Sequence, residues 1–302
     1  MVISIFPVRS FLECIWLYRY HWRNRNLAFM LSGQKPLHTI SARKIGLFNW
    51  IGLWTLYLKE VKRFMKVWLQ TVVAPTFTTL LFMAIFSLAL GGMGREVAGV
   101  PFGTFLAPGL VMMTILQNAY QNPASSILIS KVQGNIVDVL MPPLSAGELA
   151  FGYVMGGITR GVIVGLAILV TFFFWPGVEV EIQHLGVFVY FLLSGATLLS
   201  LAGVVAGVWA EKFDHAAGLN NFIIIPLSLL SGTFYSIERL PELAQKISLI
   251  NPFFYLIDGF RYSMIGRADS DITVGIWMTL GLNIVLWLLV YKIFKSGYKL
   301  KP

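Results

Sequence analysis

The chain has 302 residues, of which 57% are hydrophobic and 12% are charged, whereas a soluble domain carries about 25% charged residues. This composition excludes a water-soluble globular enzyme and indicates several membrane-spanning helices, which tolerate the 28 glycines and 13 prolines of the chain. In a soluble protein the net charge of +9 would suggest a nucleic acid partner. In a membrane protein an excess of Lys and Arg on the cytoplasmic side is the first explanation to examine.

Residues 1–46 lie before the first long apolar segment and contain no apolar stretch long enough for a signal peptide or a span. We interpret them as a loosely ordered cytoplasmic extension in which Met30 is an alternative start. The only cysteine of the chain, Cys14, lies here, so an internal disulfide is excluded.

Residues 47–66 are predicted to form an amphipathic helix that lies along the inner leaflet. Basic side chains recur at helical spacing on one face of this helix, and apolar side chains occupy another face. The basic face consists of Lys59, Lys62, Arg63 and Lys66. The alternative, which is compatible with the first interpretation, is a basic flank that only orients the first span.

Long intervals without charge indicate the membrane spans, because a charge at the bilayer centre costs about 2.5 to 3.5 kcal/mol. Five such intervals reach or exceed the roughly 20 residues that one crossing needs. A sixth, between Glu148 and Glu179, is interrupted only by Arg160, which we expect near an interface with its guanidinium extended to the headgroups. The sequence therefore predicts an all-α polytopic membrane protein with six transmembrane helices, at about residues 67–90, 102–123, 150–175, 184–209, 215–235 and 272–292.

The interval between Lys246 and Asp258 contains 11 uncharged residues, which are mostly apolar but too few to cross the membrane. We expect this segment to dip into the membrane and return. Six spans place both termini on the same side, and 17 of the 23 basic residues then lie on that side, against 5 on the other. The positive-inside rule therefore places both termini in the cytoplasm and explains the net charge without nucleic acid.

Prolines and glycines interrupt the predicted spans. Pro75, Pro108 and Pro226 fall inside the first, second and fifth spans, where each removes a helical hydrogen bond and favours a kink. Such kinks are either gating points or static bends. Glycines at spacings typical of close helix packing occur in the third and fourth spans, at Gly152, Gly156, Gly157, Gly161, Gly165, Gly203 and Gly207.

Amide side chains gather near the end of the second span and in the fifth span. They either cross-link helices or line a polar path through the membrane. The candidate path residues are Gln117, Asn118, Asn122, Asn220 and Asn221, and Gln121 belongs to the same cluster.

The sequence offers no catalytic, metal or nucleotide site. No Asp or Glu lies within a predicted span, and the four histidines lie outside the spans or at their ends. One cysteine and dispersed histidines give no metal-ligand spacing. A phosphate-binding loop of the type Gly-x-x-x-x-Gly-Lys-Ser/Thr is absent. We therefore expect no cofactor on this chain and expect any energy from ATP to come from another subunit.

Four segments resemble one family of membrane proteins. They are FLAPGLVMM at 105–113, KVQGNIVDVLMPPLS at 131–145, SGTFYSIERLPELAQKISLINP at 231–252 and NPFFYLIDGFRYSMIG at 251–266. In this order and spacing, over about residues 47–297, they are similar to the ABC type-2 transporter permease family. The resemblance is greatest to its branch of nodulation-factor exporters and multidrug-type permeases.

The resemblance implies a homodimer of six-span subunits in the bacterial inner membrane, surrounded by membrane lipids, with the substrate path between the subunits. Two copies of a separate cytoplasmic ABC ATPase would bind ATP and Mg²⁺, so this chain itself would not be an enzyme. The expected cargo is an amphipathic, lipid-linked or saccharide-type molecule or a drug, which is moved outward across the plasma membrane.

The resemblance also assigns roles to two segments. Residues 131–143 would form a cytoplasmic coupling helix between the second and third spans, whose apolar side chains plug a groove on the ATPase while Asp138 anchors it. The coupling residues are Asn135, Ile136, Val137, Asp138, Val139, Leu140 and Met141. Residues 236–262 would form two short re-entrant helices near the outer face, where charged side chains either border the path or hold a lid through ion pairs. This outer region comprises Tyr235, Glu238, Arg239, Asn251, Pro252 and Arg261.

Two other functions are weighed against export. An ion-coupled secondary transporter requires inverted repeats and an ion site near the midplane of the membrane. An intramembrane lipid-modifying enzyme requires a nucleophile and a base that face a cavity. Neither feature is evident in the sequence.

Overall fold

The computed structural model describes residues 46, 48–90, 96–97, 99–237 and 240–300. The chain divides into two units, residues 1–46 and residues 47–302. All described residues except Gly46 belong to the second unit. The cytoplasmic extension expected at 1–46 therefore lies outside the described residues, apart from Gly46.

The described part of the second unit is mostly helical. Its helical elements are α2 (Trp50–Met65), the π-helix η1 (Leu69–Val73), α3 (Ala74–Leu90), α4 (Phe102–Val132), α5 (Ile136–Leu140), α6 (Ala146–Phe173), α7 (Leu185–Trp209), α8 (Phe213–Leu219), the π-helix η2 (Asn220–Ile224), α9 (Ile225–Leu229), α10 (Glu242–Ile250), α11 (Pro252–Ile265) and α12 (Ile272–Ser296). Two short strands, β1 (Glu96–Val97) and β2 (Val100–Pro101), form an antiparallel hairpin.

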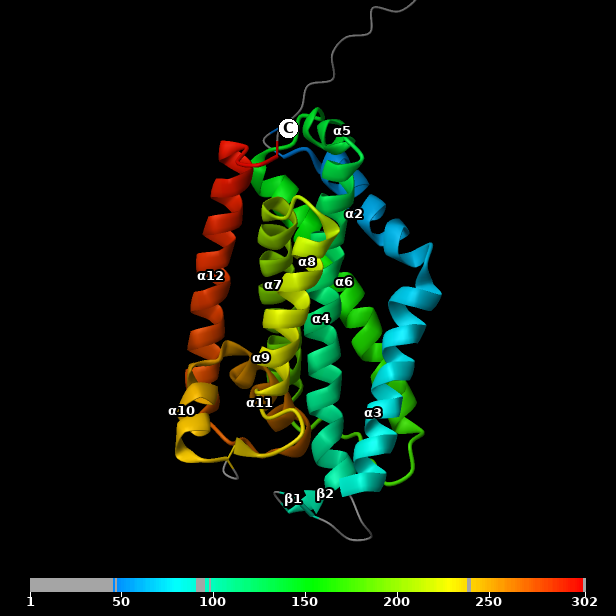
Figure 1. Ribbon diagram of the computed structural model, residues 1–302, viewed down its shortest axis with the longest axis vertical. Helices are drawn as coiled ribbons and strands as arrows, with labels where there is room; N and C mark the ends of the chain where they lie inside the picture. The colour runs from blue at the N-terminus through cyan, green and yellow to red at the C-terminus, as the bar shows by residue number, and fades with distance from the viewer. Residues whose placement is uncertain (1–45, 47, 91–95, 98, 238–239, 301–302) are drawn as a thin grey trace, which may run out of the picture. The chain divides into compact units, whose positions relative to one another are not determined.

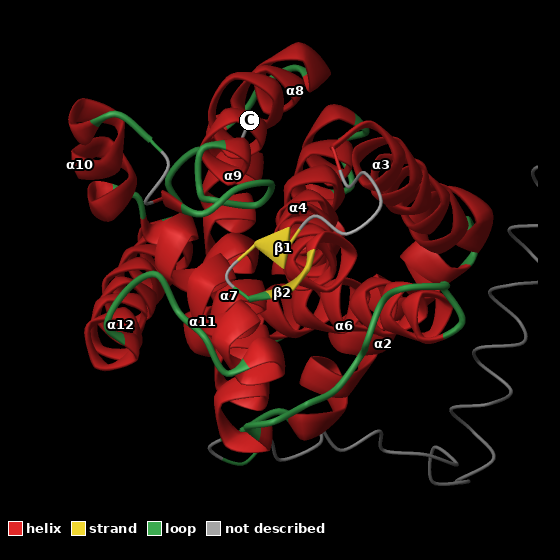
Figure 2. Ribbon diagram, turned by 90° about the horizontal axis from the view of Figure 1, so that it is seen from below, coloured by secondary structure: helices red, strands yellow, loops and turns green. Residues whose placement is uncertain are grey.

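The long helices of this unit run alongside one another as a bundle. Figure 1 shows α5 and the end of α12 at one end of the bundle, which we call the α5 end, and the β1–β2 hairpin at the other, which we call the hairpin end. Seen along the bundle, α3 and α12 lie on opposite sides, with α4 and α7 between them (Figure 2). Because nearly all residues of α4 are buried, whereas most of α3 and α12 face outward, α4 is the central helix.

Within the part of the chain that the structure describes, five helical segments are long and apolar enough to cross a membrane. They are Leu69–Ala89, Phe102–Val132, Ala146–Phe173, Leu185–Trp209 and Ile272–Ser296. They coincide with the first, second, third, fourth and sixth predicted spans. The helical, multi-pass character predicted from the sequence is therefore confirmed.

The segment predicted as the fifth span, 215–235, is shorter and less regular than expected. Its helical run passes through α8, η2 and α9 and ends at Leu229. The chain then turns, because Gly232 has a φ of 72° and the hydroxyl of Thr233 donates to the carbonyl of Ser228 at 2.7 Å. The count of six spans is thus a prediction that the structure leaves open.

Near the predicted end of the second span, α4 continues past Pro123 to Val132. A proline lacks the N–H that would bond the carbonyl four residues earlier, which here belongs to Ala119. The hydroxyl of Ser200 on α7 donates to this carbonyl at 3.3 Å instead. A neighbouring helix thus supplies the missing donor, and α4 extends well beyond the predicted boundary at residue 123.

Two of the three predicted kink sites coincide with π-helical turns. Pro75 follows η1, and Pro226 follows η2. A π turn releases backbone hydrogen bonds locally, which suits a proline that cannot donate one. By contrast, α4 continues as an α-helix through Pro108. A role of these irregular turns in gating stays a prediction.

Glycines allow α4, α6 and α7 to approach one another closely, as the glycine spacing predicts. A Cβ atom added at Gly203 of α7 would lie 2.2 Å from the carbonyl oxygen of Tyr120 on α4. One added at Gly157 of α6 would lie 2.3 Å from the Oγ of Ser200. Distances this short leave no room for any side chain, so the close packing of these helices requires glycine.

The substitution Gly203→Ala is expected to destabilise the bundle by about 1–3 kcal/mol, because the added methyl group overpacks a contact with backbone. The measurement is the midpoint of thermal unfolding in detergent, followed by size-exclusion chromatography. Gly186→Ala in the same helix is the matched control, since a Cβ there meets nothing within 4 Å. Equal midpoints for the two variants would contradict the close approach of α4 and α7.

Candidate functional site

The central helix α4 carries polar side chains on its one partly exposed face. Between positions 104 and 128 all of its residues are buried except four. These four, which we call the polar stripe, are Thr114, Gln117, Gln121 and Ser125. Their spacing places them on one side of the helix. Hydrocarbon offers polar groups no partner, but Thr114, Gln121 and Ser125 form hydrogen bonds within the subunit. A polar path, or a polar surface of another chain, is therefore indicated mainly by the partly exposed amide of Gln117.

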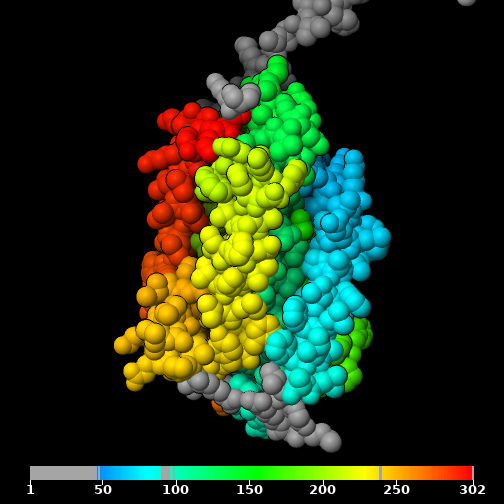
Figure 3. Space-filling model, viewed as in Figure 1, coloured from blue at the N-terminus to red at the C-terminus, as the bar shows by residue number. Residues whose placement is uncertain are grey.

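The polar stripe borders α2 and α3. The hydroxyl of Thr114 lies 3.0 Å from that of Thr79 on α3, and the hydroxyl of Ser125 accepts a hydrogen bond of 3.1 Å from Arg63 on α2. In the space-filling view, atoms of α4 are visible between the surface of α2–α3 and that of α8–α9 (Figure 3). The other helices of the subunit therefore do not fully enclose α4.

Near the hairpin end, aromatic side chains close α3 against the turn that follows α9. The ring of Phe234 in this turn lies 4.4 Å from that of Phe86 and 6.3 Å from that of Phe82, as measured between ring centroids. Such contacts are apolar and are held by no hydrogen bond or ion pair. The helices on the two sides of α4, α3 on one side and α9 with its following turn on the other, therefore meet near the hairpin end. This contact consists of aromatic rings alone, so the two sides can separate there without breaking a hydrogen bond.

A buried ionic cluster lies where α2 crosses α4. Glu60 is 0% exposed and accepts a hydrogen bond of 2.6 Å from the hydroxyl of Ser126. Its second carboxylate oxygen lies 3.2 Å from the guanidinium of Arg63 and 3.5 Å from the amide nitrogen of Asn122. Space for this carboxylic acid comes from Gly156 of α6, where a Cβ would lie 2.6 Å from that of Glu60.

Arg63 departs from the basic face predicted for α2. Lys59, Lys62 and Lys66 are exposed. Arg63 turns inward and donates to the backbone carbonyl and the side-chain oxygen of Asn122 at 2.7 and 2.9 Å. Since Glu60 and the amide lie on the inner side of the helix, they hold the guanidinium there, and three of the four predicted basic residues remain as an exposed basic face.

The prediction that Arg160 extends to the headgroups is wrong. Its side chain is only 7% exposed, and it donates to the side-chain oxygens of Asn118 at 3.0 Å and Gln121 at 3.4 Å. The physical reason is that this turn of α6 faces α4, whose amides offer acceptors within the bundle.

The predicted path amides fall into three groups. Asn118 and Asn122 are buried and cross-link α4 to α6 and α2 through the contacts given above. Gln117 lies on the polar stripe. Asn220 and Asn221 lie apart on η2 and bond to each other at 3.2 Å. The structure thus favours cross-linking for the first pair and leaves a place on a path open for Gln117.

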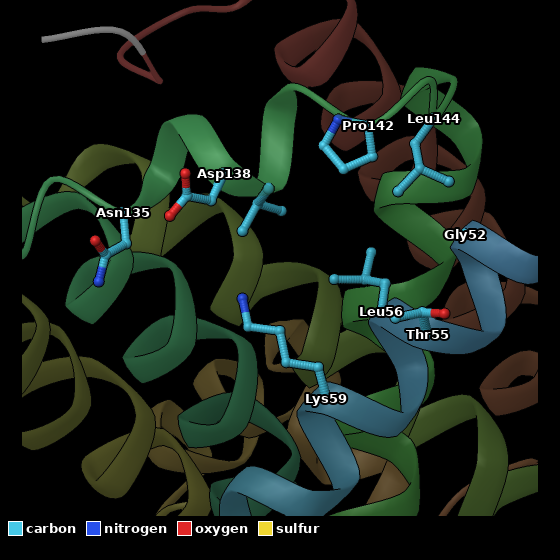
Figure 4. Close-up of a pocket in the computed structure, with 9 residues that line it drawn as sticks. Gly52, Thr55, Leu56, Lys59, Asn135, Asp138, Pro142 and Leu144 are labelled. Carbon is cyan, nitrogen blue, oxygen red and sulfur yellow. The ribbon is translucent and has the colours of Figure 1, made fainter. Parts of the chain in front are cut away.

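A cavity of about 500 Å³ lies at the α5 end, between α2 and the segment that contains α5 (Figure 4). Its lining is mostly apolar and consists of Gly52, Thr55, Leu56, Lys59, Asn135, Asp138, Val139, Pro142 and Leu144. Lys59 projects from α2 and Asp138 from α5, so opposite charges stand on its two walls (Figure 4). A side chain with an apolar stem and a polar end would therefore fit the cavity, because its stem would contact the apolar lining and its end would reach Lys59 or Asp138.

The predicted coupling helix has two different faces. Ile136 and Val139 are 4% and 9% exposed and belong to the core of the subunit. Val137 and Met141 are 46% and 76% exposed, and Asp138 is exposed beside them. Of the predicted apolar plug, Ile136 and Val139 are thus mostly covered by the subunit itself, and each is reached from outside only through a cavity beside α5.

Contacts beside α5 join the end of α4 and the segment after α12 to the segment after α7. Lys131 donates to the carbonyl of Ala210 at 2.7 Å, and Lys299 forms an ion pair of 2.9 Å with Glu211. The hydrogen bond from Lys299 lowers the pKa of the Glu211 carboxyl, and the same bond raises the pKa of the Lys299 ammonium. Together with Ile136, these residues border a smaller cavity of about 190 Å³.

The predicted re-entrant region forms α10 and α11 near the hairpin end (Figure 1). Asn251 caps α11 by accepting from the N–H of Phe253 at 3.0 Å, and Pro252 is the first residue of that helix. The amide nitrogen of Asn251 also donates to the carbonyl of Leu227 at 2.9 Å and the hydroxyl of Ser231 at 2.8 Å. One side chain therefore starts α11 and fixes it to the end of α9.

Arg261 is a structural anchor in the described part of this region. It is 2% exposed, donates to the carbonyl of Gly232, and lies 4.1 Å above the ring of Phe105. No carboxylate of the described residues forms an ion pair with it. Tyr235 is half-buried, with its hydroxyl 3.5 Å from the carbonyl of Leu229. Glu238 and Arg239 lie outside the described residues, so the predicted ion-pair lid stays a prediction.

Glu60 was absent from the site residues expected from the sequence. The signal that could have found it is a single acid within a strongly basic helix, three residues before Arg63. Among the described residues, no group of three or more His, Cys, Asp and Glu side chains could hold a metal ion.

The comparison with known proteins agrees with the resemblance of the four segments. Residues 52–265 match the model of the family described as ABC-2 type transporter. The chain is 35% identical over 253 residues to inner membrane transport permease YadH of Escherichia coli K12, which covers 83% of this chain and 98% of the relative. It is 27% identical over 234 residues to nodulation protein J of Neorhizobium galegae, which covers 76% of this chain and 86% of the relative. The chain belongs to the ABC-2 type transporter family.

Proposed function

We propose that the chain is the transmembrane subunit of an ATP-driven exporter in the bacterial inner membrane. ABC-2 permeases generally work with a cytoplasmic ABC ATPase partner. The observation that carries the proposal is the polar stripe on the most deeply buried membrane-length helix, because a helix with a purely structural role has no need of such a stripe and a transport path has. The name of the relative from Escherichia coli, an inner membrane transport permease, supports the same function and location.

The proposed subunit crosses the membrane six times, with α8, η2 and α9 together as the fifth span. The run from Phe213 to Leu229 is about 25 Å long at 1.5 Å per residue. A hydrocarbon core of about 30 Å accommodates a segment of this length by local thinning. The positive-inside rule then places the α5 end and both termini in the cytoplasm.

The path is proposed to lie between two copies of the chain. A two-fold axis would place the polar stripe of one copy opposite that of the other, which gives both stripes a polar environment. The contact of Phe86 with Phe234 would close this path near its outer end in the state described here. Movement of α3 away from the turn after α9 would open it outward.

The α5 end is proposed to bind the ATPase. The exposed face of α5, formed by Val137, Asp138 and Met141, lies beside the cavity lined by Lys59. Closure of the two ATPase subunits would move α5 and α2 together, because both helices pack against α4. An amphipathic, lipid-linked or saccharide-type cargo fits a path with polar amides and aromatic walls.

Reconstitution with an ABC ATPase that co-purifies with this chain tests the proposal. We expect the purified chain alone to hydrolyse no ATP, whereas inside-out vesicles with both proteins take up a fluorescent amphiphile when ATP is added. Replacement of the phosphate-loop lysine of the ATPase should abolish uptake. Uptake that follows a proton or sodium gradient and ignores ATP would contradict the proposal and favour a secondary transporter.

A further inference from the structure

The buried cluster around α4 contains one more positive charge than negative charges. Glu60 forms its ion pair with Arg63 at 3.2 Å, and its remaining contacts go to Ser126 and Asn122. Arg160 has only the neutral amide oxygens of Asn118 and Gln121 as acceptors, and its buried Nε has no partner. No carboxylate of the described residues therefore serves as a counter-ion for the guanidinium of Arg160.

The helices around Arg160 offer no other carboxylate for it. The segments η1–α3, α4 and α7 contain no acidic residue. On α6 itself the only acid is Glu148 in the first turn, and its carboxylate accepts from the N–H groups of Asn49 and Ser145. An uncompensated charge at membrane depth is costly, which makes such a residue a functional candidate with its missing partner to be named.

Arg160 lies directly behind the polar stripe. Gln121, which bonds to it at 3.4 Å, is one of the four partly exposed residues of that stripe. A small rotation of this one amide would expose the guanidinium to the proposed path. A guanidinium binds phosphate, sulfate and carboxylate groups through paired hydrogen bonds that are stronger than neutral ones.

We infer that Arg160, together with Asn118 and Gln121, binds the anionic group of an amphipathic substrate as it moves along the polar stripe. This inference rests on the proposed function and narrows its cargo to anionic amphiphiles. The substrate's phosphate, sulfate or carboxylate supplies the negative charge that the subunit itself does not provide. Neutral saccharides and cationic drugs are disfavoured, because the surplus positive charge of the site repels or fails to attract them.

Binding to the chain in phosphatidylcholine nanodiscs tests the inference without any need for transport. The probes are decyl phosphate and, as the uncharged match, decyl glucoside, titrated by calorimetry against empty nanodiscs. Wild type is expected to bind decyl phosphate more tightly than decyl glucoside. Arg160→Gln should weaken the binding of decyl phosphate about 10- to 100-fold and leave that of decyl glucoside unchanged. Arg160→Lys keeps the charge but not the paired hydrogen bonds, so its affinity for decyl phosphate should lie between those of wild type and Arg160→Gln.

The variant Asn118→Asp provides a second test of the anion site, which can be used even if Arg160→Gln fails to fold. This nearly isosteric change places a carboxylate about 3.0 Å from the guanidinium, so it supplies the missing counter-ion from within the subunit. It should raise the midpoint of thermal unfolding and abolish the preference for decyl phosphate. Gln183→Glu, an exposed amide outside the bundle helices, adds the same charge elsewhere and should change neither property.

Three results would overturn the inference. One is equal affinity of wild type for the two probes, and another is unchanged binding of decyl phosphate by Asn118→Asp. The third is loss of probe binding when phosphatidylglycerol is added to the nanodiscs, because the site would then hold a bilayer lipid rather than a substrate. If binding follows the expectation but vesicles with the ATPase show no ATP-dependent uptake, the exporter proposal fails and the anion site stands.

Discussion

Replacing both Val137 and Met141 with aspartate is expected to separate the subunit from the proposed ATPase partner while leaving the subunit folded. Both side chains are largely exposed on α5, so the new charges remain in water and cost the fold little. In a complex the same charges would have to enter an apolar groove. A central apolar contact of an interface contributes about 2 kcal/mol, so the loss of two, about 4 kcal/mol, corresponds to an affinity roughly 1,000-fold lower. The measurements are ATPase co-purification and ATP-dependent uptake by inside-out vesicles.

Two further variants control this experiment. Val139→Asp should fail by misfolding, because Val139 is only 9% exposed and packs in the core at the α5 end. Leu243→Asp on α10 changes a side chain that is 73% exposed near the opposite end of the bundle, and it should have no effect. If the double variant at Val137 and Met141 binds the ATPase and transports as wild type does, α5 is not the docking surface.

The resemblance predicts a coupling segment, but the sequence pattern did not resolve its faces. Residues 136–141 are apolar except for Asp138, and a helix of five residues is too short for a 3.6-residue period to separate an inner from an outer side. The inner side of α5 is set by its contact with the core, to which distant residues such as Leu56 and Val208 contribute. Such a surface depends on tertiary packing and is not encoded in the local pattern.

The long spans could be predicted because the free-energy cost of placing a charge in the membrane depends only on the residues of the segment itself. That criterion failed at two kinds of position. It predicted one continuous span over residues 215–235, although the chain turns after α9 at Gly232 and Thr233. It also treated Arg160 as a surface charge, because the acceptors on Asn118 and Gln121 lie on a different helix and become neighbours only in the folded bundle.

Glu60→Ala is expected to destabilise the subunit by about 3–5 kcal/mol, the usual cost of removing one partner from a buried ion pair. The carboxylate is fully buried and is the only acidic group in the cluster that contains Arg63 and Arg160. Without it, the buried guanidinium of Arg160 and the partly exposed one of Arg63 would lie near each other with no negative charge, and the hydroxyl of Ser126 would lose its acceptor. The measurement is the unfolding midpoint together with the yield of monodisperse protein.

The control for this experiment removes an acidic residue from an ion pair at the surface. It shows whether the loss of any paired acidic residue destabilises the subunit. Glu211→Ala also removes one side of an ion pair, that with Lys299, but both groups are solvent-exposed and the pair contributes little to stability, so the unfolding midpoint should stay close to that of wild type. The double change Glu60→Gln with Arg63→Gln should recover part of the loss, because it replaces an unpaired charge by two neutral amides that fill nearly the same space. If Glu60→Ala melts no earlier than Glu211→Ala, the cluster between α2 and α4 does not hold the amphipathic helix to the bundle. The movement proposed to pass from the α5 end to the path would then need another connection.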